Sequence, residues 1–191
     1  MKDTRQRILD AATRVFAREG VSGATTREIA RLARVNEVTL FRSFKNKDEL
    51  LRQVIIRCSE RSIHVFADAP VKTKSDLKRT VQTYAESYVR MVHENEELAR
   101  TFLGELKRHL KLCRRLFVGS VKPVRQKFIL YLETARKNRL VRKDLDATTA
   151  ADALTGMLLS GIIRRPLTES AYPTKRYVKT CVEIFLKGIE R

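Results

Sequence analysis

The sequence has few of the residues that interrupt helices. Its 191 residues include 7 glycines and 4 prolines, and leucine, arginine, lysine, glutamate and alanine, which are good helix formers, are abundant. We find no run of alternating polar and apolar residues, no internal repeat and no low-complexity linker. The composition therefore predicts an all-α fold.

Cysteines and long apolar runs are also scarce. The 3 cysteines, Cys58, Cys113 and Cys181, lie far apart and cannot all pair within one chain, so a disulfide framework is not expected. No apolar run approaches the roughly 18 residues of a membrane-spanning helix, and residues 1–16 carry charges where a signal peptide has an apolar centre. We expect a cytoplasmic protein with reduced thiols, either buried or at the surface.

Acidic residues are outnumbered by basic ones. Lys+Arg 40 against Asp+Glu 22 gives a net charge of +18, which favours a polyanionic partner such as nucleic acid, an anionic membrane surface or an acidic ligand. Residues 1–50 contribute 11 basic and 7 acidic residues, net +4, so residues 51–191 contribute the remaining +14. Within the second part, residues 107–143 hold 13 basic residues and one acid, Glu133. Charge alone therefore does not locate a nucleic-acid site.

Apolar residues recur at helical spacing along the whole chain. Over residues 4–19 they follow the i, i+3, i+4, i+7 pattern of one amphipathic helix, and Gly20 can supply its left-handed C-terminal cap. The same spacing predicts longer helices over residues 47–67, 74–92, 96–112, 121–137, 147–163 and 174–189.

Three helix-start signals lie close together in residues 25–50. Thr25 with Glu28 forms a capping box, in which the threonine oxygen accepts a backbone N–H and the glutamate reaches back. Asn36 is an N-cap, and Asn46 with Glu49 repeats the box. These signals predict two short helices, ending near residues 33 and 43, and the start of a third.

Helices this short are marginal alone and must bury apolar side chains against a longer one. The residues that we expect to pack together are Ile8, Ala12, Val15 and Phe16 of the first helix with Ile29, Ala30, Ala33, Val35, Leu40 and Phe44. Three helices with a tight second corner form a helix-turn-helix layout. A recognition helix of two turns fits a major groove about 12 Å wide; the alternative is an ordinary helical hairpin inside an all-α core.

Residues 4–51, TRQRILDAATRVFAREGVSGATTREIARLARVNEVTLFRSFKNKDELL, resemble the DNA-binding domain of the TetR family of bacterial one-component repressors. The matching features are A-A-x-x-x-F-A-x-x-G at the end of the first helix, T-T-x-x-I-A, V-x-x-x-T-L-F-x-x-F and K-x-x-L-L. The rest of the chain resembles the family in being helical, in length and in ending with two apolar helices around a polar loop.

The resemblance implies a fold and a function. The fold is all-α with about nine helices, a helix-turn-helix domain over residues 1–48 and a ligand-sensing and dimerisation domain over residues 49–191. The function is that of a ligand-responsive transcriptional regulator, most simply a repressor. It would bind a pseudo-palindromic double-stranded DNA operator as a homodimer and be released by a small-molecule effector. No cofactor, metal, membrane partner or enzymatic activity is expected.

The resemblance also implies the DNA contacts. Thr25 and Thr26 begin the second helix and Lys47 begins the fourth, and these residues would hold phosphates, aided at Thr25 and Thr26 by the positive helix end. Arg27 is the candidate for a bidentate contact to guanine.

The third helix would face the groove with Asn36, Glu37, Val38 and Thr39. Val38 and the Thr39 methyl group suit a thymine methyl, and Glu37 suits a cytosine amino group. For Asn36, capping is the better explanation.

Three positions depart from the family pattern. Phe41 replaces a usual tyrosine and Ser43 a common histidine, so phosphate contacts would pass to Arg42, Lys45 or Ser43 itself. Arg34 stands at a turn position where glycine is frequent, and a positive φ there would cost on the order of 1 kcal/mol.

The last two predicted helices resemble the family's dimerisation helices. Close approach of the helices would be permitted by small residues such as Gly156 and Ser160, and an intramolecular core explains the same apolar pattern. The residues expected at a dimer interface are Leu154, Met157, Leu158, Gly161, Val178, Val182, Phe185 and Leu186.

The effector pocket is expected among the middle helices, where aromatic residues and methionine are frequent, although such residues also form ordinary cores. The candidate pocket residues are Phe66, Tyr84, Tyr88, Met91, Phe102, Leu106, Phe128, Tyr131 and Leu132. The basic character of the region favours an anionic or amphipathic acidic effector. Alternatively, residues 107–143 form a solvated basic face that attracts DNA.

Other chemistry has weak support in the sequence. His109 and Cys113 lie at i and i+4, as metal ligands or a thiol sensor would, but no third ligand has a diagnostic spacing. We find no nucleophile elbow, phosphate loop or paired carboxylates. A basic helical protein that binds membranes peripherally, or nucleic acid without specificity, is the alternative function.

Overall fold

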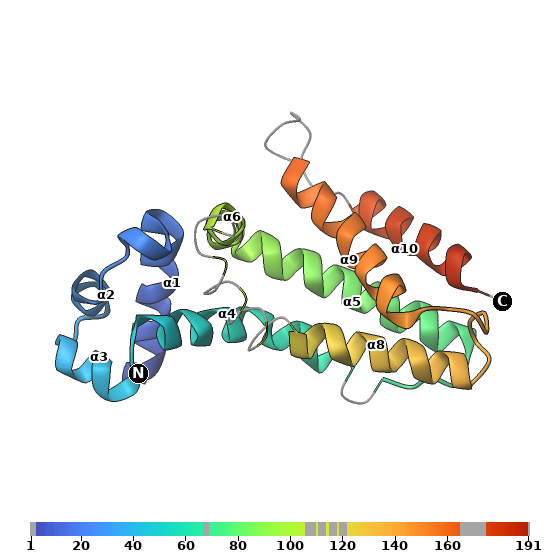
Figure 1. Cartoon of the computed structure of the whole chain (residues 1–191), viewed down its shortest axis with the longest axis horizontal. Helices are drawn as coiled ribbons and strands as arrows, with labels where there is room; N and C mark the ends of the chain where they lie inside the picture. The colour runs from blue at the N-terminus through green and yellow to red at the C-terminus, as the bar shows by residue number, and fades with distance from the viewer. Residues whose placement is uncertain are drawn as a thin grey trace. The chain divides into compact units, whose positions relative to one another are not determined.

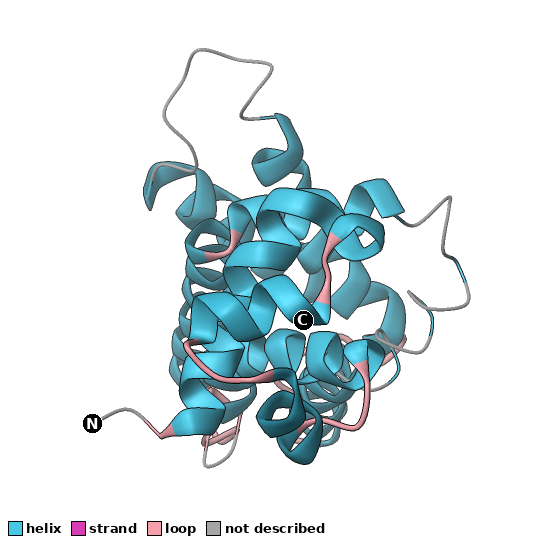
Figure 2. Ribbon diagram, turned by 90° about the vertical axis from the view of Figure 1, so that its left-hand side faces the viewer, coloured by secondary structure: helices cyan, strands magenta, loops and turns pink. Residues whose placement is uncertain are grey.

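The structure, a computed structural model, describes residues 3–66, 69–105, 122–164 and 175–190, together with residues 110, 114 and 118. Helices account for most of this part of the chain, as Figure 1 and Figure 2 show. The described helices are α1 Thr4–Gly23, α2 Thr26–Ala33, α3 Glu37–Ser43, α4 Lys47–His64, α5 Lys74–Glu94, α6 Glu96–Glu105, α8 Lys122–Lys137, α9 Ala147–Arg164 and α10 Lys175–Ile189. The all-α prediction is confirmed, and among these residues the β-pairing is the isolated bridge between Val141 and Glu190.

The chain divides into two compact units. The first comprises Met1–Ser59 and Asn95–Lys122, and the second comprises Glu60–Glu94 and Pro123–Arg191. This division differs from the boundary expected at residue 48, because α6 packs against α1 and places Leu98 in the first unit's core. The boundary between the units falls within the residues of α4.

The core of the first unit holds the short helices together as the sequence predicts. Ile8, Val15 and Phe16 of α1 are fully buried, and they share one apolar cluster with Ile29 of α2 and Leu40 of α3. Burial of a large aliphatic side chain contributes about 1.5–3 kcal/mol. This packing supplies the stability that helices of eight and seven residues lack alone.

The first helix is interrupted near its end by Gly20. This glycine has φ 73° and ψ 177°, outside the helical region, so the chain kinks before the last turn of α1. The left-handed C-terminal cap expected at Gly20 is therefore wrong: its φ is positive, but its ψ of 177° lies outside the left-handed helical region, and the helix resumes to Gly23. A side chain would disfavour this conformation. The kink leads the chain through buried Val21 and Ala24 to the start of α2.

The second unit is a bundle of α5, α8, α9 and α10 around a continuous apolar core. Its centre is aromatic: the ring centroids of Tyr84 and Phe128 lie 4.5 Å apart, and Phe66 stacks on Phe128 at 5.4 Å. The Tyr84 hydroxyl lies 3.4 Å from the Thr155 hydroxyl, so its polar end has a partner inside the bundle. No described helix has both the length and the apolar character to cross a lipid bilayer.

Arg34 ends α2 in the left-handed conformation, with φ 57° and ψ 48°. The positive φ expected at this turn is confirmed. The geometry is that of a helix C-cap, because the Arg34 amide donates to the carbonyl oxygens of Ala30 and Arg31. A side chain there costs on the order of 1 kcal/mol.

We expect Arg34→Gly to raise the free energy of unfolding by about 0.5–1 kcal/mol, because it relieves this strain, partly offset by the greater freedom of the unfolded chain. Urea denaturation followed by circular dichroism measures it. Arg14→Gly, inside helix α1, should instead lower stability by about 1 kcal/mol. Arg139, with φ 58° after α8, is a second left-handed site where glycine should stabilise. A loss of stability in Arg34→Gly would contradict the strain.

Candidate nucleic-acid interface

All three predicted caps are present in the structure. The Thr25 hydroxyl oxygen accepts the Glu28 amide at 3.2 Å, and the Asn36 side chain accepts the Thr39 amide at 2.8 Å. Asn46 accepts the Glu49 amide at 2.8 Å in the same way. These bonds satisfy amide groups that a helix start leaves without partners, and they fix where α2, α3 and α4 begin.

The reciprocal half of each capping box is a prediction that the structure contradicts. Glu28 binds the guanidinium of Arg31 at 2.8 Å and that of Arg18 at 3.4 Å. Glu49 likewise accepts from Arg52 at 2.6 Å. A charge-assisted bond to arginine is about twice as strong as a bond to a neutral amide. Both carboxylates therefore turn toward arginine side chains that the capping-box pattern ignores.

The Arg18 and Arg31 pairs make Glu28 a pH-dependent element of this unit. The hydrogen bond from Arg31, with the Arg18 charge, lowers the pKa of Glu28 to about 2 from its ordinary 4.5. A carboxylate whose pKa is lower in the folded state stabilises the fold above its unfolded pKa and loses that contribution as the pH falls through the folded value. Protonation of Glu28 should therefore weaken the unit between about pH 4.5 and pH 2.

We expect Glu28→Gln to flatten part of the decrease in melting temperature between pH 4.5 and pH 2, because glutamine has no carboxylate to protonate. Thermal unfolding at half-unit pH steps measures this slope. Glu97→Gln, at an exposed position on α6, is the matched control and should keep the wild-type slope. An unchanged slope in Glu28→Gln would show that the pairs with Arg18 and Arg31 do not contribute to stability.

Helix α3 exposes apolar side chains on the face opposite its buried residues. Val38 is 68% exposed and Phe41 is 48% exposed, whereas Leu40 and Phe44 are buried. Exposed large apolar side chains on one short helix indicate a surface that is covered when a partner binds. For Val38, the position agrees with the expected contact to a thymine methyl group.

Cationic side chains accompany this apolar face. Arg27 on α2, Arg42 on α3 and Lys45 after α3 are exposed, and none of them forms an ion pair with another described residue. Such cations are available to phosphate oxygens and base edges. This is the geometry of a helix-turn-helix DNA-binding surface. The exposed face of α3 would contact DNA, and α2 directly precedes α3 in the sequence.

Several predicted contact residues also have partners inside the protein. The Thr26 hydroxyl donates to Glu37 at 2.7 Å, the Thr39 hydroxyl donates to Asn36 at 2.8 Å, and Ser43 donates to the Thr39 carbonyl at 3.1 Å. One Glu37 oxygen is therefore engaged. The Thr26–Glu37 bond joins α2 to α3, whereas the other two bonds are local to α3. The role of these hydroxyl groups toward DNA stays a prediction.

Lys47 has a structural role that the sequence did not reveal. Its ammonium group donates to the carbonyl oxygens of Val21 at 2.9 Å and Ala24 at 3.1 Å. These carbonyls lie at the end of α1 and just beyond it, where a cation also suits the negative end of the helix dipole. Lys47 thus ties the start of α4 to the corner between α1 and α2; its phosphate contact stays a prediction.

Two arginines that sequence reasoning missed connect α1 to the rest of the unit. The Arg5 guanidinium lies 5.0 Å from the centre of the Phe44 ring. Arg57 on α4 donates to the Asp10 carboxylate at 2.8 Å and the Thr13 hydroxyl at 3.2 Å. Both pairs join residues far apart in the sequence, so no local spacing signals them.

The residues predicted for a dimer interface lie mainly in the core of the second unit. Leu154, Leu158, Val178, Val182, Phe185 and Leu186 are buried within one protomer, as is Gly161, while Met157 is partly buried. The intramolecular core that the sequence left open therefore accounts for these residues. Their contact with a second copy stays a prediction.

The predicted pocket residues also pack together in this core. One aromatic cluster contains Phe66, Tyr84, Tyr88, Phe128 and Tyr131, and Leu132 belongs to the same core. Met91 is half-buried. The side chain of Phe102, all of Leu106, and His109 and Cys113 lie outside the described residues, as does most of residues 107–121. A ligand role for the predicted set stays a prediction.

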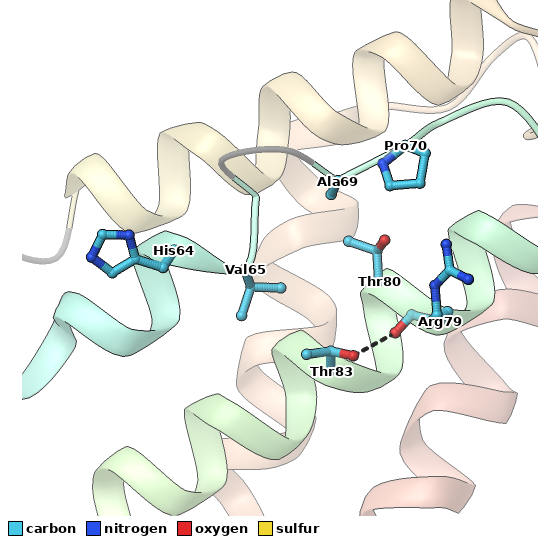
Figure 3. A pocket seen from close by; sticks show the side chains of 7 residues that line it. All are labelled: His64, Val65, Ala69, Pro70, Arg79, Thr80 and Thr83. Atoms are coloured by element: carbon cyan, nitrogen blue, oxygen red, sulfur yellow. Dashed lines mark hydrogen bonds between the residues drawn. The ribbon is translucent and has the colours of Figure 1, made fainter.

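A small hollow in the second unit has a different lining (Figure 3). It encloses about 260 Å³ and is lined by His64, Val65, Ala69, Pro70, Arg79, Thr80 and Thr83. Two of its polar side chains have partners: Thr83 donates to the Arg79 carbonyl at 2.9 Å, and Arg79 pairs with Asp76 at 2.9 Å. Its volume is below the range of about 300–1,000 Å³ that is typical of ligand pockets.

The capped α2 and α3, the tight corner at Arg34 and the exposed face of α3 define a helix-turn-helix DNA-binding protein. Residues 8–54 match the family model described as bacterial regulatory proteins, tetR family. Over this helix-turn-helix segment, the chain is therefore similar to the tetR family of transcriptional regulators.

Relatives and solved structures agree with this assignment. The uncharacterized HTH-type transcriptional regulator YvkB of Bacillus subtilis is 23% identical over 192 residues, covering 99% of this chain and 98% of the relative. The HTH-type transcriptional repressor DhaR of a Mycobacterium species is 24% identical over 197 residues, covering 97% and 94%. The fatty acid degradation regulator FadR of Bacillus halodurans has the same fold, with a TM-score of 0.75, 18% identity and coverage of 97% and 96%.

Proposed function

We propose that the protein is a repressor that binds a pseudo-palindromic operator as a homodimer and leaves it when a small-molecule effector binds. The observation that carries the DNA-binding part is the outer face of α3, where Val38 and Phe41 are exposed beside the uncommitted cations Arg27, Arg42 and Lys45. A base-reading surface needs apolar groups for thymine methyls and cations for guanine and phosphate. Repression is favoured by the name of the relative DhaR.

The dimer is supported by the outer faces of α9 and α10. Ile163 is 48% exposed and Ile184 is 57% exposed. An added Cβ at Gly156 or Gly188 would meet no neighbour within 4 Å, so packing inside the protomer does not explain these glycines. Isoleucines beside small residues suit a close helix-to-helix contact between two copies. This exposed face, and not the buried residues of the same helices, is the interface that we propose.

Release of DNA requires a link between the reading head and the second unit, and α4 provides residues to both. The clamp of Arg57 on Asp10 and Thr13 joins α4 to α1. We propose that the effector favours a different placement of α4 and that the clamp carries α1 with it. A coupling of roughly 1–3 kcal/mol between effector and operator is enough for such regulation.

The experiment that tests the function is selection of bound sequences from random DNA duplexes, followed by anisotropy titration of the selected duplex at several salt concentrations. We expect an inverted repeat with half-sites about one helical turn apart and a steep loss of affinity with salt. A scrambled duplex of the same length is the control. Enrichment of no sequence, with equal binding to the scrambled duplex, would contradict operator recognition.

A further inference from the structure

A groove on the second unit, between α5 and α10, has the volume of a ligand site. These two helices pack against each other, and the groove between them encloses about 860 Å³. This volume lies within the usual range of about 300–1,000 Å³ for small-molecule sites. None of the residues predicted for the aromatic pocket lines this groove, but two residues predicted for the dimer interface, Val178 and Val182, do.

The floor of the groove is apolar and its walls are cationic. Its aliphatic lining consists of Val89, which is half-buried, and of Val178 and Val182, which also belong to the core and are 4% and 1% exposed. Lys78 and Arg90 of α5 and four further charged residues line the sides, and the basic residues outnumber the acidic ones. The charged lining residues are Lys78, Glu86, Arg90, Lys175, Lys179 and Glu183.

The acidic residues of the groove already have donors, whereas most of the cations do not. Glu86 accepts from Gln82 at 2.8 Å, and Glu183 lies 3.9 Å from the Lys179 ammonium. Within the described residues, Arg90 and Lys175 have no hydrogen-bond or ion-pair partner. The groove therefore carries positive charge that protein groups do not neutralise.

Two of the free cations come from different helices of the groove. Arg90 lies near the end of α5 and Lys175 begins α10, which runs in the opposite direction to α5 in Figure 1, whereas Lys78 lies near the start of α5. An arginine fork and an ammonium group together suit a carboxylate or phosphate. The three valines supply the apolar part of the lining of the same groove.

We propose that this groove binds an anionic amphiphile, with the head group at Arg90 and Lys175 and an aliphatic chain along Val89, Val178 and Val182. A neutral or cationic chain would leave the two cations without a partner. We identify this ligand with the effector of the proposed function. Its effect on DNA binding therefore rests on that function, whereas its binding to the groove does not. The shared chemistry is an alkyl chain with an anionic head group, which a carboxylate and a phosphate both provide.

Titration calorimetry of the full chain with dodecanoate, below its micelle threshold, tests the site. Dodecyl phosphate is the second anionic probe, and dodecyltrimethylammonium has the same chain with the opposite charge. We expect the anions to bind at one molecule per protomer and Arg90→Glu/Lys175→Glu to weaken them at least tenfold. The matched control is Lys127→Glu/Lys137→Glu, which makes the same charge change at exposed positions on α8 and should bind as wild type.

The possible results separate the groove from the proposed function. Absence of dodecanoate binding, equal binding by Arg90→Glu/Lys175→Glu, or equally tight binding of dodecyltrimethylammonium would each overturn the site. Release of the selected operator by dodecanoate in the wild type and not in Arg90→Glu/Lys175→Glu would support the effector role, and binding without release would overturn that role. If neither the wild type nor any variant binds an operator in the absence of dodecanoate, the proposed function is contradicted. The calorimetric evidence for the groove would still stand.

Discussion

Replacing Arg27 with alanine is expected to weaken operator binding by about 1–3 kcal/mol, roughly 5- to 150-fold, and to relax the preference at one base position. Arg27 follows the N-cap of α2 by two residues, is exposed and has no ion pair among the described residues. A bidentate contact to guanine is lost entirely on truncation, because alanine has no donor. Anisotropy titrations with the selected operator and with all single-base variants of one half-site measure both effects.

Lys127→Ala on α8 is the matched control, since it also removes one exposed positive charge. If Arg27 contributes only general electrostatic attraction to DNA, both variants should lose the same affinity for every duplex. The salt dependence of DNA affinity should then fall in both. We expect Lys127→Ala to change affinity little and to keep the base preference. If Arg27→Ala binds more weakly with an unchanged preference at every position, Arg27 contacts phosphate and does not read a base.

The helices of the first unit were predictable because their signals are local. Thr25 and Asn36 accept amide groups three residues onward, which is a distance set by helix geometry alone. Arg34 was recognised as a strained turn from its place between two such helices, and its φ of 57° agrees. Local chemistry thus determined where these helices start and stop.

The side-chain partners were less predictable because they depend on tertiary structure. Glu28 and Glu49 satisfy a capping box in sequence, yet each binds arginine, and for Glu28 one of the two arginines, Arg18, belongs to another helix. The Lys47 ammonium reaches the Val21 carbonyl, 26 residues away. Spacing identifies which groups are near on one helix and leaves open the competing partners that folding brings from other helices.

The apolar pattern of α9 and α10 likewise did not show which helix face packs inside the protomer and which remains exposed. Apolar periodicity identified Leu158 and Phe185 as buried but gave no means of separating a core within one chain from an interface between two. The structure shows which of these residues the core of one chain buries, and Ile163 and Ile184 remain exposed after this core is formed. These exposed residues had no distinct signal in sequence, since isoleucine at the edge of an apolar stripe is consistent with either environment.

Ile184→Glu is therefore expected to convert the proposed homodimer to a monomer and to reduce operator affinity by roughly 10²- to 10⁴-fold, which is the gain from linking two binding modules. A carboxylate placed at a 57%-exposed position leaves the protomer's own core intact. In a contact between two copies it is buried without a partner, which costs several kcal/mol. Sedimentation equilibrium should give a mass near 22.1 kDa in place of twice that value.

Leu130→Glu on α8 is the control that separates loss of the dimer from a general effect of a new charge. Leu130 is 52% exposed in the same unit, so the two substitutions match in chemistry and in exposure. It should remain dimeric and bind the operator as wild type. Binding of half-site DNA by Ile184→Glu at wild-type monomer affinity would show that its reading head is intact, because only the second head has been lost. A dimeric Ile184→Glu would place the interface on another face of the second unit, and the two reading heads would then have to reach successive major grooves by a different pairing of helices.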